Sequence, residues 1–442
     1  MKFIFADSLD YVDPAFDFIA DRSPAERQPY WDDAYPHEIL GYAPYDGVLV
    51  SRGIVGDHRV KGKYTASQAR RFRLVGVRKF LRLDTPQFAH LDIFGDCGAF
   101  TYVKDEHPPY SPAEMAEFYD ECGFTHGASV DHIIFDFQVG GSGMAGGSAD
   151  ARQRFDITLE NAEGFRREAK AIDASFTPLG VVQGWSPGSM AEAARRLVAM
   201  GYDYLALGGM VPLRSPEIKQ CLTAVRDAVP ASTRLHILGF AKADDIDGFH
   251  SFDISSFDTT SPLIRAFKDA RQNYYLPGHG AALRYYTSIR VPQAIENPKL
   301  QRAVKRGTLR AEELVRLEAH ALGALRAFDR GDAGLDETLD HVLAYSAPLL
   351  EERPYEECKD SPALARLAER YRRTLTERPW TECSCPICKQ AAVDVIIFRG
   401  SNRNKRRGIH NLAVYHDHIE RLDLKRAVDP DHDLLGSFCA AE

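Results

Sequence analysis

The sequence predicts an α/β fold, a (β/α)₈ barrel that carries a helical insertion, and three observations support this prediction. Short apolar runs alternate with amphipathic helical patterns from about residue 47 to about residue 258, and repeated β-then-α units are typical of a parallel sheet. Polar residues or glycines stand at the carboxyl ends of several of these runs. The alternation then stops, and residues 259–382 carry apolar residues at helical spacing instead.

Eight segments are expected to be strands, and eight such strands fit a closed barrel; a doubly wound open sheet is the alternative. The expected strands are residues 47–52, 79–84, 90–96, 132–137, 178–184, 204–209, 235–240 and 253–258. In a barrel the carboxyl ends of the strands meet at one mouth, where active sites are built. The residues at these ends are Asp96, Asp136, Gln183, Gly208, Gly209 and Asp258.

Composition excludes some classes of protein. Of the 442 residues, 44% are hydrophobic and 27% are charged, which is typical of a globular protein with a sizeable core. The net charge of −8 gives no general attraction to nucleic acid, so any such binding must come from local basic patches. The first residues lack the apolar run of a signal peptide, and nothing approaches the length of a membrane span. We expect a soluble, cytoplasmic protein that does not bind membranes.

The most specific local pattern is a cluster of thiols near the carboxyl end. Cys383, Cys385 and Cys388 lie within six residues, and histidines follow at positions 410, 416 and 418. Three thiolates and an imidazole are the ligand set of a closed, tetrahedral zinc site, which leaves no position for a substrate and is therefore structural. The remaining five cysteines are scattered, so no disulfide framework is predicted.

Two carboxylates at strand ends are candidates for chemistry at a glycosidic bond. Asp96 stands in Asp-Cys-Gly-Ala-Phe and Asp258 in Phe-Asp-Thr-Thr. Cleavage of an N-glycosidic bond needs a carboxylate that traps the sugar and a second one that shuttles a proton to and from the base. A lone Asp is more often a helix cap or a turn residue.

These motifs together resemble the queuine-type tRNA-guanine transglycosylase family, over residues 47–258 and again over 380–420. The resemblance implies Asp96 as general acid and base, Asp258 as nucleophile and His410 as the fourth zinc ligand. It also implies that the base is held by Asp136, Gln183, Gly208, Gly209 and Phe100. The segments that carry it, in chain order, are Asp96–Phe100, Phe135-Asp136, Val182-Gln183-Gly184, Gly208-Gly209-Met210, Phe257-Asp258 and the cysteine cluster.

Departures from the family pattern favour one branch of it. Trp185 stands where the family has a glycine, which puts a bulky ring near the expected pocket. The basic signature of the bacterial tRNA enzymes is absent after Asp258. The chain is most similar to the DpdA-type DNA-guanine transglycosylases of 7-deazaguanine modification systems. The resemblance implies that guanine in double-stranded DNA is exchanged for 7-cyano-7-deazaguanine (preQ0). It also implies a partner ATPase that opens the duplex and pairing of two copies through the zinc region.

Four regions are expected along the chain: residues 1–46 as an N-terminal extension packed on the barrel, 47–262 as the catalytic core, 263–379 as the helical insertion, and 380–442 as the zinc-binding segment with a C-terminal helix. The best candidate for contact with DNA phosphates is the basic stretch beside the zinc ligands. Its basic residues are Arg399, Arg403, Lys405, Arg406 and Arg407.

Three alternative functions stay open, and two motifs that resemble other kinds of site are not interpreted as such sites. The chain could act on tRNA, could be a non-catalytic zinc-bearing subunit on the same barrel, or could be an unrelated barrel hydrolase. A non-catalytic subunit would be expected to have lost the paired carboxylates. The run 141–146 spells Gly-x-Gly-x-x-Gly, but no helix is expected directly after it, so we read it as a loop over the pocket and not as a dinucleotide site. Cys97 is expected to be a small packing residue.

Overall fold

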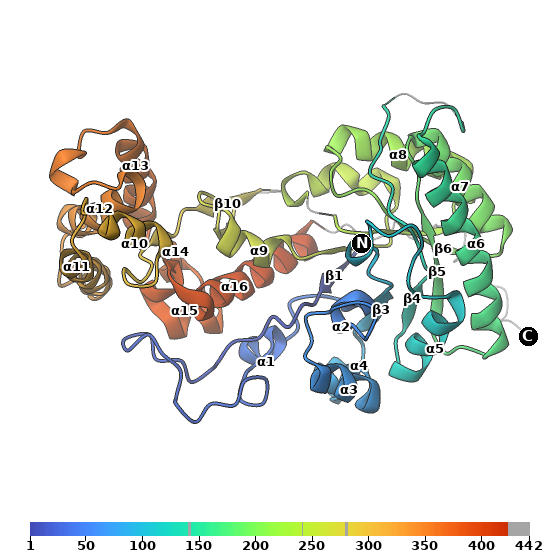
Figure 1. The fold of residues 1–442 in the computed structure, drawn as a ribbon, viewed down its shortest axis with the longest axis horizontal. Coiled ribbons are helices and arrows are strands. Elements are labelled where there is room, and N and C mark those ends of the chain that lie inside the picture. Colours follow the sequence, from blue (N-terminus) through green and yellow to red (C-terminus); the bar gives the residue numbers. More distant parts are fainter. Residues whose placement is uncertain (140–142, 241, 279–281, 423–442) are drawn as a thin grey trace, which may run out of the picture. The chain divides into compact units, whose positions relative to one another are not determined.

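The computed structural model describes residues 1–139, 143–240, 242–278 and 282–422 (Figure 1). The chain divides into two compact units. The first, here called the barrel unit, consists of Met1–Leu9, Tyr45–Thr260 and, among the described residues, 419–422. The second, the helical unit, consists of Asp10–Pro44 and Ser261–His418.

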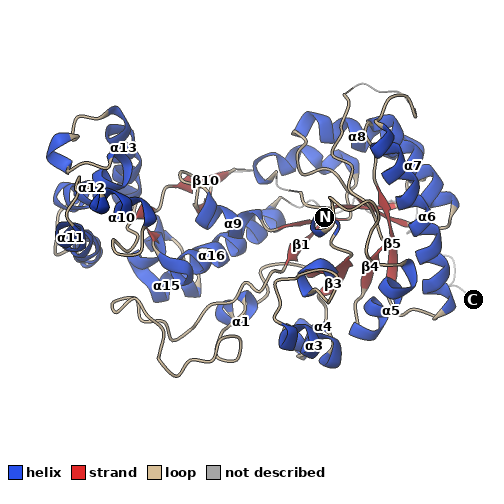
Figure 2. Cartoon of the chain, in the orientation of Figure 1, coloured by secondary structure: helices blue, strands red, loops and turns tan. Residues whose placement is uncertain are grey.

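The barrel unit contains a closed barrel of eight parallel strands in sequential order, which confirms the predicted fold class. Closure is made by the first and last strands, where Ile4 lies opposite Asp258. Figure 2 shows the strands in red, and the helices α5, α6 and α7 pack on strands β4 and β5. The strands are β1 (Lys2–Ala6), β2 (Gly47–Ser51), β3 (Asp92–Asp96), β4 (His126–Ala128), β5 (Thr177–Val182), β6 (Tyr204–Leu207), β7 (Arg234–Ile237) and β8 (Ser256–Thr259).

Helices of the barrel unit follow most strands. Several begin with a side-chain cap; Ser111, for example, accepts a hydrogen bond from the N–H of Glu114, which satisfies a donor at the start of the helix. Gly95 and Gly127 let α5 approach the sheet, because a Cβ at either position would lie within 2.5 Å of the Tyr119 ring. The helices are α2 (Arg52–Val55), α3 (Ala66–Val75), α4 (Val77–Phe80), α5 (Pro112–Cys122), α6 (Ala149–Ala171), α7 (Pro187–Ala199) and α8 (Ser215–Ala228).

Two of the expected strands are wrong, and two barrel strands, β1 and β4, were not expected. The barrel begins with β1, in the segment predicted to be an extension. Residues 79–84 form the end of α4 and a turn, in which Arg82 has a φ of 57°. Residues 132–137 are not a strand, because the N–H groups of His132 and Ile134 are bonded to the side chains of Thr158 and Gln183 instead of a neighbouring strand.

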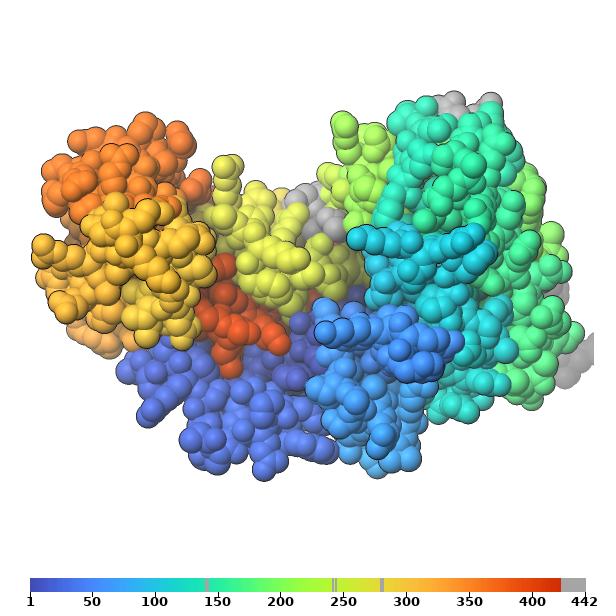
Figure 3. Space-filling model, in the orientation of Figure 1, coloured from blue at the N-terminus to red at the C-terminus, as the bar shows by residue number. Residues whose placement is uncertain are grey.

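The helical unit confirms the predicted helices of the insertion. Helix α11 buries Leu314, Ala321 and Leu325, and α13 buries an apolar face at the predicted spacing. Figure 3 shows the side chains of residues 298–377 gathered in one body, coloured gold to orange. The helices of the helical unit are α1 (Pro36–Leu40), α9 (Ser261–Lys268), α10 (Pro298–Lys305), α11 (Ala311–Arg330), α12 (Leu335–Glu351), α13 (Pro362–Glu377), α14 (Pro379–Glu382), α15 (Pro386–Ala391) and α16 (Gly400–Arg421).

Two small sheets join parts of the helical unit that are far apart in sequence. Strands β9 (Tyr274–Pro277) and β10 (Leu283–Tyr286) are antiparallel, and β11 (Ile289–Arg290) pairs in parallel with β12 (Ile397–Phe398). The second pair ties the segment after α9 to the segment after the cysteines. No helix in the described ranges is long and apolar enough to cross a membrane.

Candidate active site and metal centre

The nucleophile candidate Asp258 lies in β8 and is held through one of its two oxygens. Its Oδ1 accepts a hydrogen bond from the backbone N–H of Gly239 at 3.0 Å and lies 3.2 Å from Nε2 of His236. The side chain is 10% exposed, so it is enclosed but reachable. Gly239 has a φ of 68°, a left-handed conformation that points its N–H at the carboxylate and favours glycine.

The second carboxylate, Asp96, ends β3 and accepts hydrogen bonds from the backbone of Gly98 and the hydroxyl of Ser51. Burial raises the pKa of Asp96 to about 7, and the negative charges of Asp131 and Asp258 add to this effect. Gly98 has a φ of 87°, and a Cβ there would lie 2.6 Å from the backbone nitrogen of Gly53, so this turn requires glycine. Near neutral pH, Asp96 can therefore both give and take a proton.

Asp131 is a further residue of this cluster, and the sequence did not reveal it. It follows β4, is 2% exposed, and has a pKa raised by burial. Its carboxylate accepts a hydrogen bond from Nε2 of Gln183 at 2.6 Å and one from the thiol of Cys97 at 3.0 Å. The segment after β4 contains two Asp residues, Asp131 and Asp136. Which of them is enclosed depends on where the strand ends, and the sequence predicted this strand at 132–137 instead of 126–128.

Gln183, Gly208 and Gly209 lie together, as the sequence predicted for strand ends at one mouth. A Cβ on Gly208 would lie 2.2 Å from the amide nitrogen of Gln183, and one on Gly209 would lie 3.3 Å from its amide oxygen. Gly209 has a φ of 71°. The Gln183 oxygen also accepts the N–H of Ile134 at 3.3 Å. Glycine at these positions leaves room beside the Asp131–Gln183 pair.

Asp136 and Phe100 are exposed, and the structure does not bring Asp136 to this cluster. Asp136 accepts a hydrogen bond from the N–H of Ser148 at the start of α6. Because residues 132–137 leave the sheet, its side chain is displaced from the position that was predicted for it. Phe100 is 60% exposed, and its ring centroid lies 6.1 Å from that of Phe135, which is 47% exposed.

Cys97 and Trp185 are buried. The Cys97 thiol is 2.9 Å from the Tyr102 hydroxyl, and burial raises its pKa well above the usual value, so it is not poised as a nucleophile. Trp185 does not enter the pocket: its ring packs on Gly147 and its indole N–H donates to the carbonyl of Ala145. The predicted loop at 141–146 lies partly outside the described residues; Gly143 and Met144 form a turn, and α6 begins at Ala149.

The metal centre lies in the helical unit, and its geometry fits zinc. One ligand atom from each of Cys383, Cys385, Cys388 and His410 lies within 4.8 Å of all the others. The three sulfurs are 3.5, 3.5 and 3.3 Å from Nδ1 of His410. A tetrahedral zinc with ordinary bond lengths separates sulfur and nitrogen by about 3.6 Å. Bound zinc would cross-link α15 to α16.

The groups around this cluster orient its ligands. Nε2 of His410 lies 2.8 Å from the carbonyl of Tyr275, which directs the lone pair of Nδ1 toward the thiols. The Tyr274 ring stacks on His410 at 4.2 Å, and its hydroxyl lies 3.2 Å from the sulfur of Cys388. These contacts fix His410 as the histidine that belongs to the cluster.

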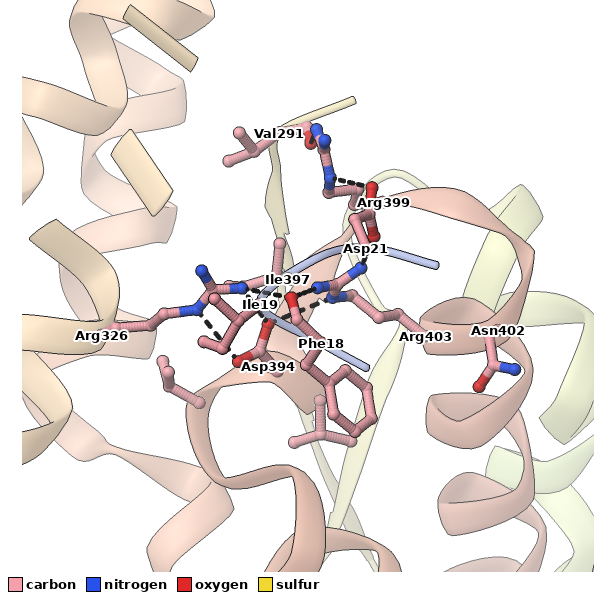
Figure 4. A network of polar contacts seen from close by, with 12 residues as sticks. Phe18, Ile19, Asp21, Val291, Arg326, Asp394, Ile397, Arg399, Asn402 and Arg403 are labelled. Carbon is pink, nitrogen blue, oxygen red and sulfur yellow. Dashed lines mark hydrogen bonds and ion pairs between the residues drawn. The ribbon is translucent and has the colours of Figure 1, made fainter. Parts of the chain in front are cut away.

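The basic stretch after the cysteines, which was predicted to contact DNA, is largely enclosed in the structure. Arg399, Arg403, Arg406 and Arg407 are each at most 6% exposed. Figure 4 shows Arg403 paired with Asp21 and with Asp394, at 3.1 Å from the latter, and Arg399 paired with Asp21 at 2.7 Å. These contacts tie the segment Asp10–Pro44 to α16 within the helical unit.

Arg406 and Arg407 are enclosed in the same way. Arg406 donates to the backbone carbonyl of Asp13 at 2.7 Å, and Arg407 donates to the carbonyls of Val395 and Ile397 at 3.2 and 3.3 Å. Lys405 is half-buried over the Tyr11 ring. Burial of an arginine requires that nearly all its donors be bonded, so these side chains hold the unit together.

The closed barrel and the Cys₃His centre agree with the guanine transglycosylase class that the sequence resembles. The chain is 39% identical over 422 residues to a DNA-guanine transglycosylase of Salmonella montevideo, and the match covers 95% of this chain and 97% of that protein. A scan against protein-family models found no match. The chain belongs to the DNA-guanine transglycosylase family and is a guanine transglycosylase.

Proposed function

We propose that this enzyme exchanges guanine in DNA for a 7-deazaguanine, preQ0, through a covalent link between Asp258 and the deoxyribose. The observation that carries the proposal is the difference between the two carboxylates. Asp258 is held by a backbone N–H and faces an imidazole, whereas Asp96 has a pKa of about 7. One group suits a nucleophile and the other a proton carrier.

The reaction divides into two displacements at C1′. An oxygen of Asp258 forms a bond to C1′ while the bond from C1′ to N9 of guanine breaks, and protonated Asp96 gives its proton to the leaving base. The incoming 7-deazaguanine then gives its N9 proton to Asp96, and its N9 displaces Asp258 from C1′. Asp96 ends protonated, as it began, so protons and charges balance over the exchange.

The Asp131–Gln183 pair supports recognition of the base. Guanine and 7-deazaguanine share an N1–H and a 2-amino group, and an enclosed carboxylate accepts hydrogen bonds from both. Gln183 and Gly209 lie beside this carboxylate, and we assign contacts with the rest of the edge to them. Phe100 and Phe135 present exposed rings on which a flipped base can stack.

DNA is the proposed polymer because the similarity to a DNA-guanine transglycosylase extends over nearly the whole of both chains. An enzyme that acts on a base inside a duplex must extrude it, at a cost of a few kcal/mol of unstacking. An enzyme that acts on tRNA would use the same chemistry. The two hypotheses are therefore distinguished only by which polymer, DNA or tRNA, is modified.

The test offers labelled preQ0 to the purified chain with three substrates in parallel: duplex DNA, the same duplex with a mismatched bubble around the guanine, and unmodified tRNA. The bubble removes the need for a partner that opens the duplex. We expect incorporation into DNA, stronger in the bubble, and loss of both incorporation and covalent adduct in Asp258→Asn. Asp84→Asn, which changes an exposed carboxylate in the same unit, is the matched control.

Each outcome decides one point. Incorporation into tRNA alone would overturn the DNA assignment and keep the chemistry. An adduct that persists in Asp258→Asn would remove Asp258 as the nucleophile. No incorporation into any of the three substrates would favour a non-catalytic subunit.

A further inference from the structure

The two hydrogen-bonding groups that face Asp258 reach the same oxygen. The N–H of Gly239 and Nε2 of His236 both face Oδ1, at 3.0 and 3.2 Å. Among the described residues, none donates a hydrogen bond to Oδ2. The carboxylate is therefore anchored through one atom, and the other atom keeps its lone pairs for attack.

Behind His236 the contacts continue through two further buried side chains. Nδ1 of His236 lies 2.6 Å from the hydroxyl of Ser256, and the same hydroxyl lies 2.6 Å from that of Tyr204. His236 and Ser256 are fully enclosed, and Tyr204 is 4% exposed. The chain therefore runs from Tyr204 through Ser256 and His236 to the nucleophile, inside the barrel and shielded from water.

Only one direction of donation satisfies every member of this chain when Asp258 is a carboxylate. Since a carboxylate can only accept, His236 must donate from Nε2. A neutral imidazole then accepts at Nδ1, so Ser256 donates to His236. The Ser256 oxygen in turn accepts the hydroxyl proton of Tyr204. Every proton points toward Asp258.

The direction of donation takes His236 as a neutral imidazole, and the groups packed around it are mainly aromatic. The ring is fully buried and stacks on Phe94 with centroids 5.0 Å apart. The ring of His126 stacks on Phe94 as well, at 4.3 Å. Two imidazoles on one aromatic ring in an enclosed space would repel each other if both were charged, and burial lowers the pKa of His126 to about 4. The other titratable and charged groups that face these rings are Asp258, Tyr204, Asp92, Arg234 and Lys2. Of these, Asp92 favours a charged His126, whereas Arg234 and Lys2 disfavour it.

We propose that Tyr204, Ser256 and His236 form a one-way chain of hydrogen-bond donors that anchors Oδ1 of Asp258 and leaves Oδ2 as the attacking atom. The three are positioning residues, since none of them touches the sugar. The inference rests on the proposed function for the identity of the nucleophile, but the chain itself is a property of the fold.

Because the members act in series, the chain makes a specific kinetic prediction. Ser256→Ala should lower kcat about tenfold, with KM for the base changed by less than about twofold, since the imidazole that donates to Asp258 loses its own donor. Tyr204→Phe should lower kcat about threefold. The double variant should be no slower than Ser256→Ala, because breaking the chain at Ser256 already removes the effect of Tyr204. Additive losses would overturn the proposal.

Two measurements separate positioning from simple damage to the fold. The acid limb of the pH profile for adduct formation should move to higher pH in Ser256→Ala, because a carboxylate with weaker donors is more easily protonated. Ser346→Ala, which removes a buried hydroxyl in the helical unit, should leave this limb in place. An unmoved limb in Ser256→Ala would contradict the proposal.

A direct measurement does not depend on the reaction. In ¹⁵N-histidine NMR of the wild-type chain, His236 should show the tautomer with the proton on Nε2. Its signal among the 15 histidines is assigned by its loss in His236→Gln. A proton on Nδ1, or a charged ring, would overturn the proposed direction. If wild-type enzyme forms no adduct but the tautomer is as expected, then the proposed function fails and the chain stands.

Discussion

A carboxylate oxygen of Asp96 and one of Asp131 lie within 4.8 Å of each other at the mouth of the barrel. Two enclosed carboxylates at this distance do not both ionise readily, and the pKa of each is raised, burial being the largest cause and for Asp96 the charge of Asp131 the next. The pair therefore retains a proton near neutral pH. This proton is what departure of a purine base requires.

Asp131→Asn should affect both proton transfer and recognition of the base. Without the neighbouring charge the pKa of Asp96 falls, so the protonated form that releases guanine is lost at lower pH, and the alkaline limb of kcat moves to lower pH. Loss of a buried acceptor should also raise KM for the base about tenfold. Steady-state kinetics between pH 6 and 9 measure both effects.

Asp136→Asn is the matched comparison for Asp131→Asn, because the two residues lie on the same segment and only Asp131 is enclosed. We expect Asp136→Asn to leave both KM and the pH profile within about twofold of wild type. If instead Asp136→Asn changed KM and the pH profile and Asp131→Asn did not, the segment after β4 would have to rearrange when a base binds.

Asp96→Asn should stabilise the fold while it removes activity. Between the usual pKa of an aspartate, near 4, and about 7, the folded chain binds more protons at this residue than the unfolded chain does. The free energy of unfolding therefore falls as pH rises through this window. Replacing the carboxylate should raise the free energy of unfolding by about 2 kcal/mol at pH 8 and by almost nothing at pH 4.

Urea denaturation at the two pH values checks this expectation, with the exposed Asp84→Asn as the control that should show no gain at either. A gain for Asp96→Asn that is equal at pH 4 and pH 8 would attribute the stabilisation to hydrogen bonding and not to ionisation.

The barrel could be predicted from the sequence because its parallel strands are buried on both faces and appear as short apolar runs. Six of the eight expected strands are present with shifted ends. The segment 132–137 has the same composition, but it is bonded to Gln183 and Thr158, which come from distant parts of the chain. Such side-chain partners are invisible in a local pattern. The same displacement hid Asp131 and left Asp136 exposed.

The metal centre was predictable because the spacing of its cysteines is itself the signal, whereas the role of the arginines was not. A run of basic residues is the same in sequence whether it faces water or carboxylates. The partners of Arg399 and Arg403 include Asp21, which lies far away along the chain and belongs to a segment with no pattern of its own. Burial by such a distant segment turns an apparent DNA-binding surface into an internal ion-pair network.

The purified chain should contain one zinc ion, and Cys388→Ala should lose it. Since a closed Cys₃His site contributes to folding, the helical unit should melt at lower temperature after the substitution or after chelation. Elemental analysis and thermal melting followed by circular dichroism measure the two effects. Cys358→Ala, which removes another buried cysteine of the same unit, should retain the metal.

Arg403→Met should destabilise the protein without changing how tightly the folded protein binds DNA. The substitution leaves Asp21 and Asp394 with fewer donors in an enclosed position, so we expect a loss of about 3 kcal/mol in the free energy of unfolding. Arg302→Met, at an exposed position on α10, should change it by less than about 0.5 kcal/mol.

The salt dependence of DNA binding distinguishes a structural arginine from one that contacts a phosphate. Loss of a single phosphate contact lowers the slope of log K against log salt by about 0.9. For Arg403→Met, measured below its melting temperature, the slope should equal that of the wild type because the guanidinium is 1% exposed and already paired. A slope reduced by about 0.9 would mean that Arg403 leaves its carboxylate partners when DNA binds. The ion-pair network would then contain groups that bind phosphate after they separate from their carboxylate partners, in addition to supporting the fold.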